Sequence, residues 1–242
     1  MTAKWNFART RNVPKFNLGT RGTDPATRVC DKDDKTLMTT HADEFQALSD
    51  TLYHWSVYDP AVKCEIGCTA LKAASGWIVI DPVPLAEAAW KELLVMASLR
   101  AILLTNGNHV RDALALRDRH KVPVVTAPDT RRDITELRPD VTLLPNELLY
   151  GVTAIAIPGA TPGETAFYSK TGVMILGDAV INISPEAGLE FLPDKYCANA
   201  EQNRASLRKL LEYDFHTLTF AHGSPVTTRA KEKLSALLDH TS

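Results

Sequence analysis

The first 23 residues contain no aspartate or glutamate, although the whole chain has 29 acidic and 27 basic residues. Lysine and arginine supply all the charge of this segment, and a proline and two glycines interrupt any helical pattern. Such a segment has no core of its own, so residues 1–45 are predicted to be an N-terminal arm on a domain spanning 46–242. The alternative for residues 1–23 is an organellar transit peptide, which has a similar basic composition.

Long apolar runs are also missing. The sequence has no stretch of about 18 apolar residues, so no membrane-spanning helix is expected. It has no short apolar segment near its start of the kind that directs secretion. The net charge of −2 argues against a nucleic-acid partner. We therefore expect a cytoplasmic protein whose partners are a small molecule or another protein subunit.

The four cysteines are too few and too scattered to form a framework. Cys30, Cys64, Cys68 and Cys197 make neither a CxxC pair nor a disulfide pattern, which favours buried thiols in a reducing compartment. Cys64 and Cys68 are four residues apart on an expected strand, which separates them by ~13 Å. That distance is too long for a disulfide or a shared metal, so core packing is the expected role of both.

Several catalytic motifs are absent. The chain has no GxSxG nucleophile elbow, no phosphate-binding P-loop and no GxGxxG after a strand. A glycine-containing turn at 159–163 includes a proline where a phosphate cradle needs backbone N–H groups. Serine-hydrolase, nucleotide-triphosphatase and dinucleotide-dependent chemistry are therefore not expected.

Hydrophobic periodicity divides the domain into two halves, each a run of strands followed by strand and helix in alternation. This pattern predicts an α/β (α+β) protein with two packed sheets and outer helices. The expected strands are 51–58, 65–71, 76–81, 101–104, 122–126, 141–144, 153–157, 164–168, 173–176 and 217–220, and the expected helices are 85–98, 111–120, 200–212 and 228–238.

Four short fragments rich in glycine, proline, aspartate or histidine stand out along the chain. They read WIVIDP at 77–82, IPGATPG at 157–163, MILGDA at 174–179 and FAHGSP at 220–225. They resemble the "LIDTG" strand, the "PGHTPG" turn, the "FTGDA" segment and the "PGHGP" segment of the metallo-β-lactamase superfamily. The resemblance covers about residues 52–238. It implies a four-layered αββα sandwich, metallo-β-lactamase-like, with an N-terminal extension.

The superfamily's main metal-binding motif is replaced. Where the family carries Thr-His-x-His-x-Asp-His at the end of a strand, this chain reads Thr-Asn-Gly-Asn-His from residue 105. In that register, the two leading histidines fall on Asn106 and Asn108, the aspartate falls on Val110 and the third histidine falls on Arg111. The resemblance therefore implies the fold of the family with a degenerate metal site.

Of the seven metal-ligand positions of the family, two keep their residue type in this chain. The histidine of the "PGHTPG" turn is Ala160 here, which leaves Asp178 and His222 as the retained positions among seven. Asparagine oxygens are neutral, hard donors, and valine and alanine cannot ligate, so a tight di-zinc site is not expected. The first interpretation is that no cofactor binds, and that Asp178 and His222 are the weak remnant of a lost metal site. The alternative is that the protein binds one divalent ion, which is zinc, iron or manganese.

The sequence allows two interpretations of the role of Arg111. Its guanidinium would repel a metal ion, and it could replace the lost metal charge by forming a bidentate pair with Asp178. Alternatively, Arg111 begins the following helix and points to solvent.

His109 and Asp112 complete the candidates for the cleft. His109 is one residue away from any ligand position of the motif, so a cap or supporting role is favoured over a side chain pointing into the cavity beside Asn108. Asp112 is favoured as a helix N-terminal charge over an active-site acid.

The leading interpretation is a pseudoenzyme: a superfamily member that resembles metallo-hydrolases, has lost most di-metal ligands, and binds a ligand or serves a structural role. The cleft is expected between Asn106, Asn108, Asp178 and His222. The alternative is a mononuclear-metal hydrolase of an ester, lactone, thioester or phosphodiester bond that uses Asp178 and His222. A homo-oligomer, or a partner subunit bound through the arm, is also expected.

Overall fold

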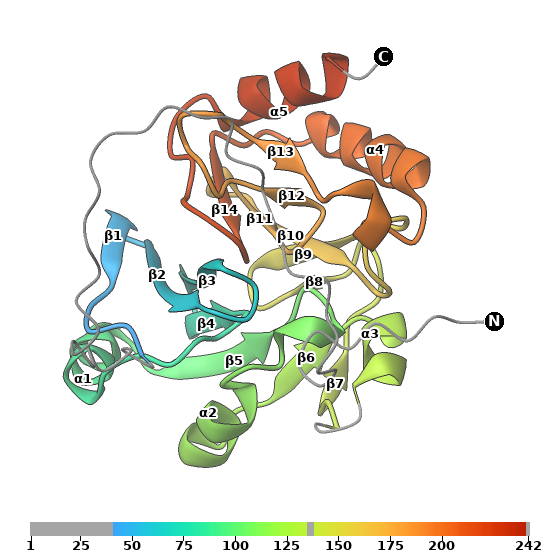
Figure 1. Ribbon diagram of the computed structural model, residues 1–242. Helices are drawn as coiled ribbons and strands as arrows, with labels where there is room; N and C mark the ends of the chain where they lie inside the picture. The colour runs from blue at the N-terminus through green and yellow to red at the C-terminus, as the bar shows by residue number, and fades with distance from the viewer. Residues whose placement is uncertain (1–40, 135–137, 241–242) are drawn as a thin grey trace, which may run out of the picture.

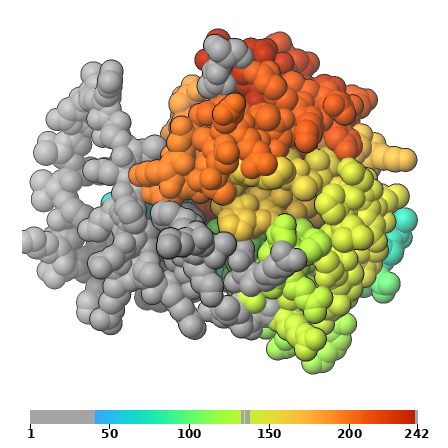
Figure 2. All heavy atoms as spheres, turned by 90° about the vertical axis from the view of Figure 1, so that its right-hand side faces the viewer, coloured from blue at the N-terminus to red at the C-terminus, as the bar shows by residue number. Residues whose placement is uncertain are grey.

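The computed structural model describes residues 41–134 and 138–240. Two large sheets face each other, and each carries helices on its outer side (Figure 1). Figure 2 shows the same order on an adjoining face, with orange and red C-terminal segments above, yellow segments in the middle and green segments below. The four-layered αββα sandwich expected from the sequence is confirmed.

The strands and helices have the following bounds. The seven-stranded sheet contains, in spatial order, β1 (Gln46–Ser49), β2 (Leu52–Asp59), β3 (Cys64–Ala73), β4 (Gly76–Ile80), β5 (Leu99–Leu103), β6 (Val124–Thr126) and β7 (Val141–Thr142). The five-stranded sheet contains β14 (Thr217–Phe220), β11 (Val173–Leu176), β10 (Thr165–Ser169), β9 (Val152–Ala156) and β8 (Leu148–Leu149), and a small sheet pairs β12 (Val180–Ile181) with β13 (Glu190–Phe191). The helices are α1 (Glu87–Met96), α2 (Ala113–His120), α3 (Pro128–Asp133), α4 (Ala200–Arg208) and α5 (Ala230–Asp239), with 3-10 turns η1 (Gly107–His109), η2 (Asp194–Tyr196) and η3 (Lys209–Glu212).

Three hydrophobic cores separate the four layers. On β4, Trp77 and Val79 face α1 and α2, whereas Ile78 and Ile80 face the second sheet. This alternation is the strand period of two, with both faces covered. On the far side, the second sheet packs against α4 and α5 through a core that includes Phe220.

The structure shifts or adds a few elements. The expected helix 111–120 begins two residues later as α2, and the expected helix 200–212 tightens into η3 after α4. The sequence did not predict β1, α3, or the two-residue strands β8, β12 and β13.

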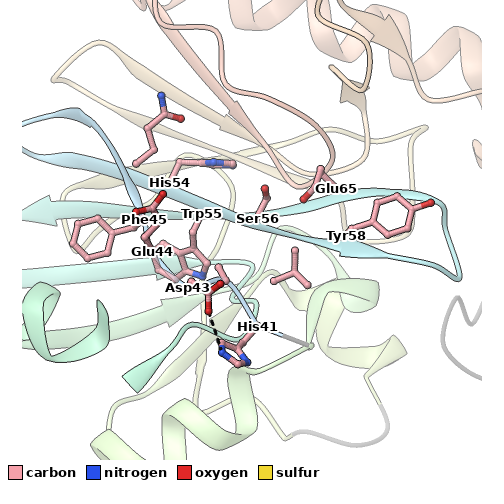
Figure 3. A pocket seen from close by; sticks show the side chains of 12 residues that line it. His41, Asp43, Glu44, Phe45, His54, Trp55, Ser56, Tyr58 and Glu65 are labelled. Carbon is pink, nitrogen blue, oxygen red and sulfur yellow. Dashed lines mark ion pairs between the residues drawn. The ribbon is translucent and has the colours of Figure 1, made fainter. Parts of the chain in front are cut away.

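Residues 1–40 lie outside the described residues, so the docking expected of the arm stays a prediction for them. Its described end is attached to the segment between β4 and α1: Ala42 donates a backbone hydrogen bond to Pro84, and Ala86 donates one to Ala42. Between residues 41–46 and β2 lies a hollow of about 680 Å³, at whose edge His41 pairs with Asp43 at 3.5 Å (Figure 3). Within 41–134 and 138–240, none of the helices has the length and apolar character needed to span a membrane.

The ring of His54 on β2 is packed against Gly67 of β3. A Cβ at Gly67 would lie 2.7 Å from His54 Nε2, so only glycine leaves room for this ring. Nε2 is buried without a hydrogen-bond partner among the described residues, and burial lowers the pKa of His54 from 6.5 to about 4. The native protein therefore holds this imidazole neutral.

This burial predicts a loss of stability in acid. Below pH 6.5 the unfolded chain protonates His54 while the native state does not, so the free energy of unfolding falls until about pH 4. The shift is worth about 3 kcal/mol. Denaturant titrations at pH 7 and pH 4 should show a smaller acid loss, by about that amount, for His54→Leu than for the wild type. His240→Leu, at an exposed position, is the control; equal acid losses in all three proteins would refute the assignment.

Candidate metal centre

Four segments meet at one end of the two sheets. Asp81 follows β4, residues 105–112 follow β5, Asp178 follows β11 and His222 follows β14. Each of these strands pairs in parallel with a neighbour, and the carboxyl ends of parallel strands form a shared crevice. Gly177 allows the two sheets to approach here, since a Cβ at this position would clash with Thr105 Oγ1 and Glu164 Oε1.

Asp81 organises the loop that follows β5. Its Oδ1 accepts a hydrogen bond from the Thr105 N–H at 2.8 Å, and its Oδ2 accepts one from the Thr105 hydroxyl at 2.6 Å. His109 Nδ1 lies 3.0 Å from the same Oδ2 and 2.8 Å from Thr105 Oγ1. A proton on Nδ1 is therefore held by two acceptors, which orients the ring and directs Nε2 into the crevice.

The short turn η1 places His109 in the crevice. It begins at Asn106, whose side-chain oxygen accepts a hydrogen bond from the Asn108 N–H at 2.9 Å. The His109 side chain is 2% exposed, and Nε2 lies 3.2 Å from Asp178 Oδ1. Nε2 nevertheless makes no well-aligned hydrogen bond within the described residues, so this buried nitrogen has only the ion-pair contact with the Asp178 carboxylate.

Asp178 joins the two histidines. Its Oδ1 lies 3.2 Å from His109 Nε2 and 3.1 Å from His222 Nε2, and the two imidazole rings are 5.5 Å apart. One ligand atom from each of these three residues lies within 4.8 Å of the others. Asp178 Oδ2 instead accepts a hydrogen bond from Asn106 Nδ2 at 3.0 Å. The carboxylate therefore presents one oxygen to the histidines and has the other fixed.

Glu164 ties the surrounding loops together. Its Oε1 accepts hydrogen bonds from the Asp178 and Ala179 N–H groups at 2.8 and 3.3 Å. Its Oε2 accepts hydrogen bonds from Thr161 Oγ1 and Asn106 Nδ2, both at 2.7 Å. Burial and the nearby Asp178 carboxylate raise the pKa of Glu164 to about 7.

The ionisable groups of the crevice depend on one another. Burial and the Arg111 charge lower the pKa of His109, but Asp81 and Asp178 outweigh them and raise it to about 9. Burial opposes the ionisation of Asp178, yet His109 and His222 hold the pKa of this carboxyl well below its usual range. Burial lowers the pKa of His222. Asp178 is thus an anion that faces two imidazoles.

Arg111 does not pair with Asp178, and that prediction is wrong; it does not point to solvent either. Its Nη1 donates to the backbone carbonyls of Gly67 and Asp81 at 2.9 and 3.3 Å, and its Nη2 donates to that of Ala221 at 3.3 Å. Arg111 has a φ of 37°, and this left-handed backbone redirects the chain before α2. The guanidinium therefore joins segments of both sheets beside the crevice.

The other sequence candidates are placed less centrally. Asn106 enters the crevice, but it presents its amide nitrogen to the carboxylates while its oxygen caps η1. Asn108 is half-buried, with a backbone contact only among the hydrogen bonds of the described residues. Asp112 precedes α2 without capping it, and burial raises its pKa. Ala160 is fully buried and offers no ligand atom.

Three residues that shape the crevice had no site role predicted from the sequence: Asp81, Glu164 and Cys64. Asp81 lies within the fragment 77–82 and Glu164 follows the fragment 157–163, so the position of each could have indicated a site role. Cys64 had none. Its Sγ lies 3.5 Å from His222 Nδ1, and burial and then Asp59 raise the pKa of the thiol to about 11. Core packing alone therefore does not describe Cys64, whereas Cys68 lies in the core beneath the helices.

The donor set decides how many metal ions fit. The other family ligand positions are Asn106, Asn108, Val110, Arg111 and Ala160. The Asn106 oxygen caps η1, Arg111 is a cation, and Val110 and Ala160 are apolar, so Asn108 alone offers a free, neutral oxygen for a second ion. A single ion fits better, because His109, Asp178 and His222 converge and His109 Nε2 lacks a hydrogen-bond partner. Two imidazoles and a carboxylate are ligands that zinc and iron accept.

The chain is similar to known proteins over most of its length. Residues 47–240 match the family described as the metallo-beta-lactamase superfamily. DIM-1 metallo-beta-lactamase is 15% identical, with a TM-score of 0.65 over 83% of this chain and 99% of that one. A metallo-beta-lactamase from Pontibacter korlensis is 15% identical, with a TM-score of 0.64 over 81% and 98% of the two chains.

The protein TTHA1623, solved in a di-iron-bound form, is 22% identical, with a TM-score of 0.55 over 72% of this chain and 94% of that one. These identities establish a shared fold alone. A comparison with curated proteins finds no match. The family match over residues 47–240 shows that the chain belongs to the metallo-β-lactamase superfamily, and the low identities are those of a divergent member.

Proposed function

We propose that the crevice binds one divalent metal ion through His109, Asp178 and His222, and that the protein is a single-metal hydrolase. The observation that carries this proposal is the convergence of these three ligand atoms within 4.8 Å. Three protein ligands with a further position left open is the usual composition of a catalytic zinc site. The substrate bond would be an ester, a lactone, a thioester or a phosphodiester.

The residues around the ligands support this role. A bound ion would act as a Lewis acid and activate water for attack on the substrate. Asp81 holds the Nδ1 proton of His109, which leaves Nε2 free to ligate. Asn106 holds Asp178 Oδ2, so Oδ1 is the oxygen directed to the metal position. These contacts keep the ligands in place before an ion binds.

The second candidate is a non-catalytic homologue that binds a small molecule or serves as a structural subunit. The balance of charges among the ionised groups of the crevice favours this second candidate. Asp81 and Asp178 supply two negative charges, which Arg111 and a protonated His109, with its pKa of about 9, neutralise without a metal when Glu164, with its pKa of about 7, carries its proton. In this state a proton on His109 takes the place of the ion. The two candidates thus differ in what neutralises Asp178.

Metal content separates the two candidates. Protein purified without chelator should contain about one zinc or iron ion per chain, and His109→Ala and His222→Ala should each lose it because two protein ligands hold such ions weakly. His240→Ala, at an exposed site, should keep it. Activity is then measured with one substrate of each of the four bond types. Metal content near zero in the wild type would favour the non-catalytic candidate.

We further propose a cytoplasmic protein that associates with itself or with a partner subunit through residues 1–45. The basic, acid-free composition of the first 23 residues supports an interaction role for the arm.

A further inference from the structure

Cys64, the first residue of β3, contacts the ring nitrogen of His222 that faces away from the crevice. Its Sγ lies 3.5 Å from His222 Nδ1, and the residue is 7% exposed. We infer that Cys64 is a positioning residue, which holds the His222 ring so that Nε2 faces Asp178 and the metal position. This inference rests on the proposed single-metal site.

The backbone fixes the two residues relative to each other. Ile66 of β3 forms an antiparallel bridge with His222, and the Gly223 N–H donates to the Glu65 carbonyl at 3.1 Å. The Gly67 N–H donates to the Ala221 carbonyl at 2.8 Å. The start of β3 is thus paired with the segment after β14 on both sides of His222. The sulfur and the imidazole are held in contact by this pairing.

A thiol suits both states of the histidine. When Nε2 ligates a metal ion, the proton of the neutral ring is on Nδ1. The Nδ1–H group then donates a hydrogen bond to the sulfur, which is a weak acceptor. When no ion is bound and Nε2 carries the proton towards Asp178 Oδ1, 3.1 Å away, Nδ1 is an acceptor and the S–H donates. Cys64 therefore supports the same ring orientation with or without the metal. A hydroxyl has the same capacity, whereas a methyl group has none.

The geometry separates Cys64 from the ligands themselves. The sulfur faces Nδ1, while Nε2 of the same ring faces Asp178 Oδ1. The two nitrogens of an imidazole point in diverging directions, so a metal ion bound at Nε2 lies away from the sulfur. Cys68, four residues along β3, is buried in the core beneath the helices and serves as the matched control.

Cobalt binding to the full-length protein tests the inference. Cobalt(II) is titrated into the wild type, Cys64→Ala, Cys64→Ser and Cys68→Ala, and the visible ligand-field absorption gives the dissociation constant. Cys64→Ala should weaken binding about tenfold, the lower end of the range for a group that supports a ligand. Cys64→Ser should recover most of that loss, and Cys68→Ala should match the wild type.

A second measurement does not depend on the metal. In chelator-treated protein, the ¹⁵N chemical shifts of the His222 ring should report one dominant tautomer in the wild type and in Cys64→Ser, and a mixture in Cys64→Ala. If the wild type bound no cobalt, the single-metal proposal would fail while these shifts still decided the role of Cys64. Unchanged shifts and unchanged affinity in Cys64→Ala would overturn the inference. So would a thiolate-to-cobalt charge-transfer band that Cys64→Ala abolishes, because Cys64 would then be a ligand.

Discussion

Asp178→Ala is expected to destabilise the protein by about 3 kcal/mol and to abolish metal binding. The carboxylate is 4% exposed and lies beside both histidines and Asn106, so its removal takes one anionic neighbour from each of the three. Breaking a buried charged pair costs ~3–5 kcal/mol, and we take the lower end because His109 keeps Asp81. Denaturant unfolding and metal analysis of the same preparations measure the two effects.

Asp118→Ala is the matched control, since Asp118 lies on α2 with 66% of its side chain exposed and pairs with the adjacent Arg117. We expect its stability and metal content to equal those of the wild type, because exposed pairs contribute little. If Asp178→Ala kept the metal and the stability of the wild type, Asp178 would not be the residue that joins the two histidines.

Arg111→Ala is expected to lower the free energy of unfolding by about 3 kcal/mol. Its guanidinium donates to the carbonyls of Gly67, Asp81 and Ala221, which belong to segments of both sheets. A hydrogen bond from a charged donor contributes ~1.5–3 kcal/mol, and each of the three carbonyls loses this charged donor, although that of Ala221 keeps the Gly67 N–H. Arg111→Lys should recover only part of the loss, because one ammonium cannot replace the planar fork.

Arg100→Ala is the control for Arg111→Ala, because Arg100 is an exposed arginine on β5, the strand that precedes η1 and Arg111. Arg100→Ala should leave the unfolding transition where it is. Equal stabilities for Arg111→Ala and Arg100→Ala would mean that the guanidinium does not join the two sheets.

The sequence predicted the strands and helices that have a clear apolar pattern and are buried. β4 and β11 are continuous apolar stretches ended by glycine or proline, and both were expected within a residue of where they lie. The two-residue strands β12 and β13 are too short to show any period. The helix α3 begins at Pro128, a favoured first helical residue, but its six residues include no apolar repeat. Short elements thus depend on tertiary pairing that local pattern does not carry.

The site was predicted in part. Asp178 and His222 stand in fragments that keep the family order, and both lie in the crevice. For His109, counting along the family motif favoured a role outside the ligand set. The direction of its ring depends on η1 and on the contact with Asp81, which lies 28 residues earlier in the sequence. The partners of Arg111 are backbone carbonyls, and the residue types of a sequence do not reveal such contacts.

X-ray absorption of the zinc-loaded protein tests the central claim most directly. The account predicts one zinc ion per chain, with a first shell of nitrogen and oxygen that includes two imidazoles from His109 and His222. It predicts no sulfur ligand and no zinc–zinc distance at ~3.5–4 Å. A zinc–zinc distance in that range, or no zinc retained after dialysis, would contradict the claim that His109, Asp178 and His222 hold a single metal ion.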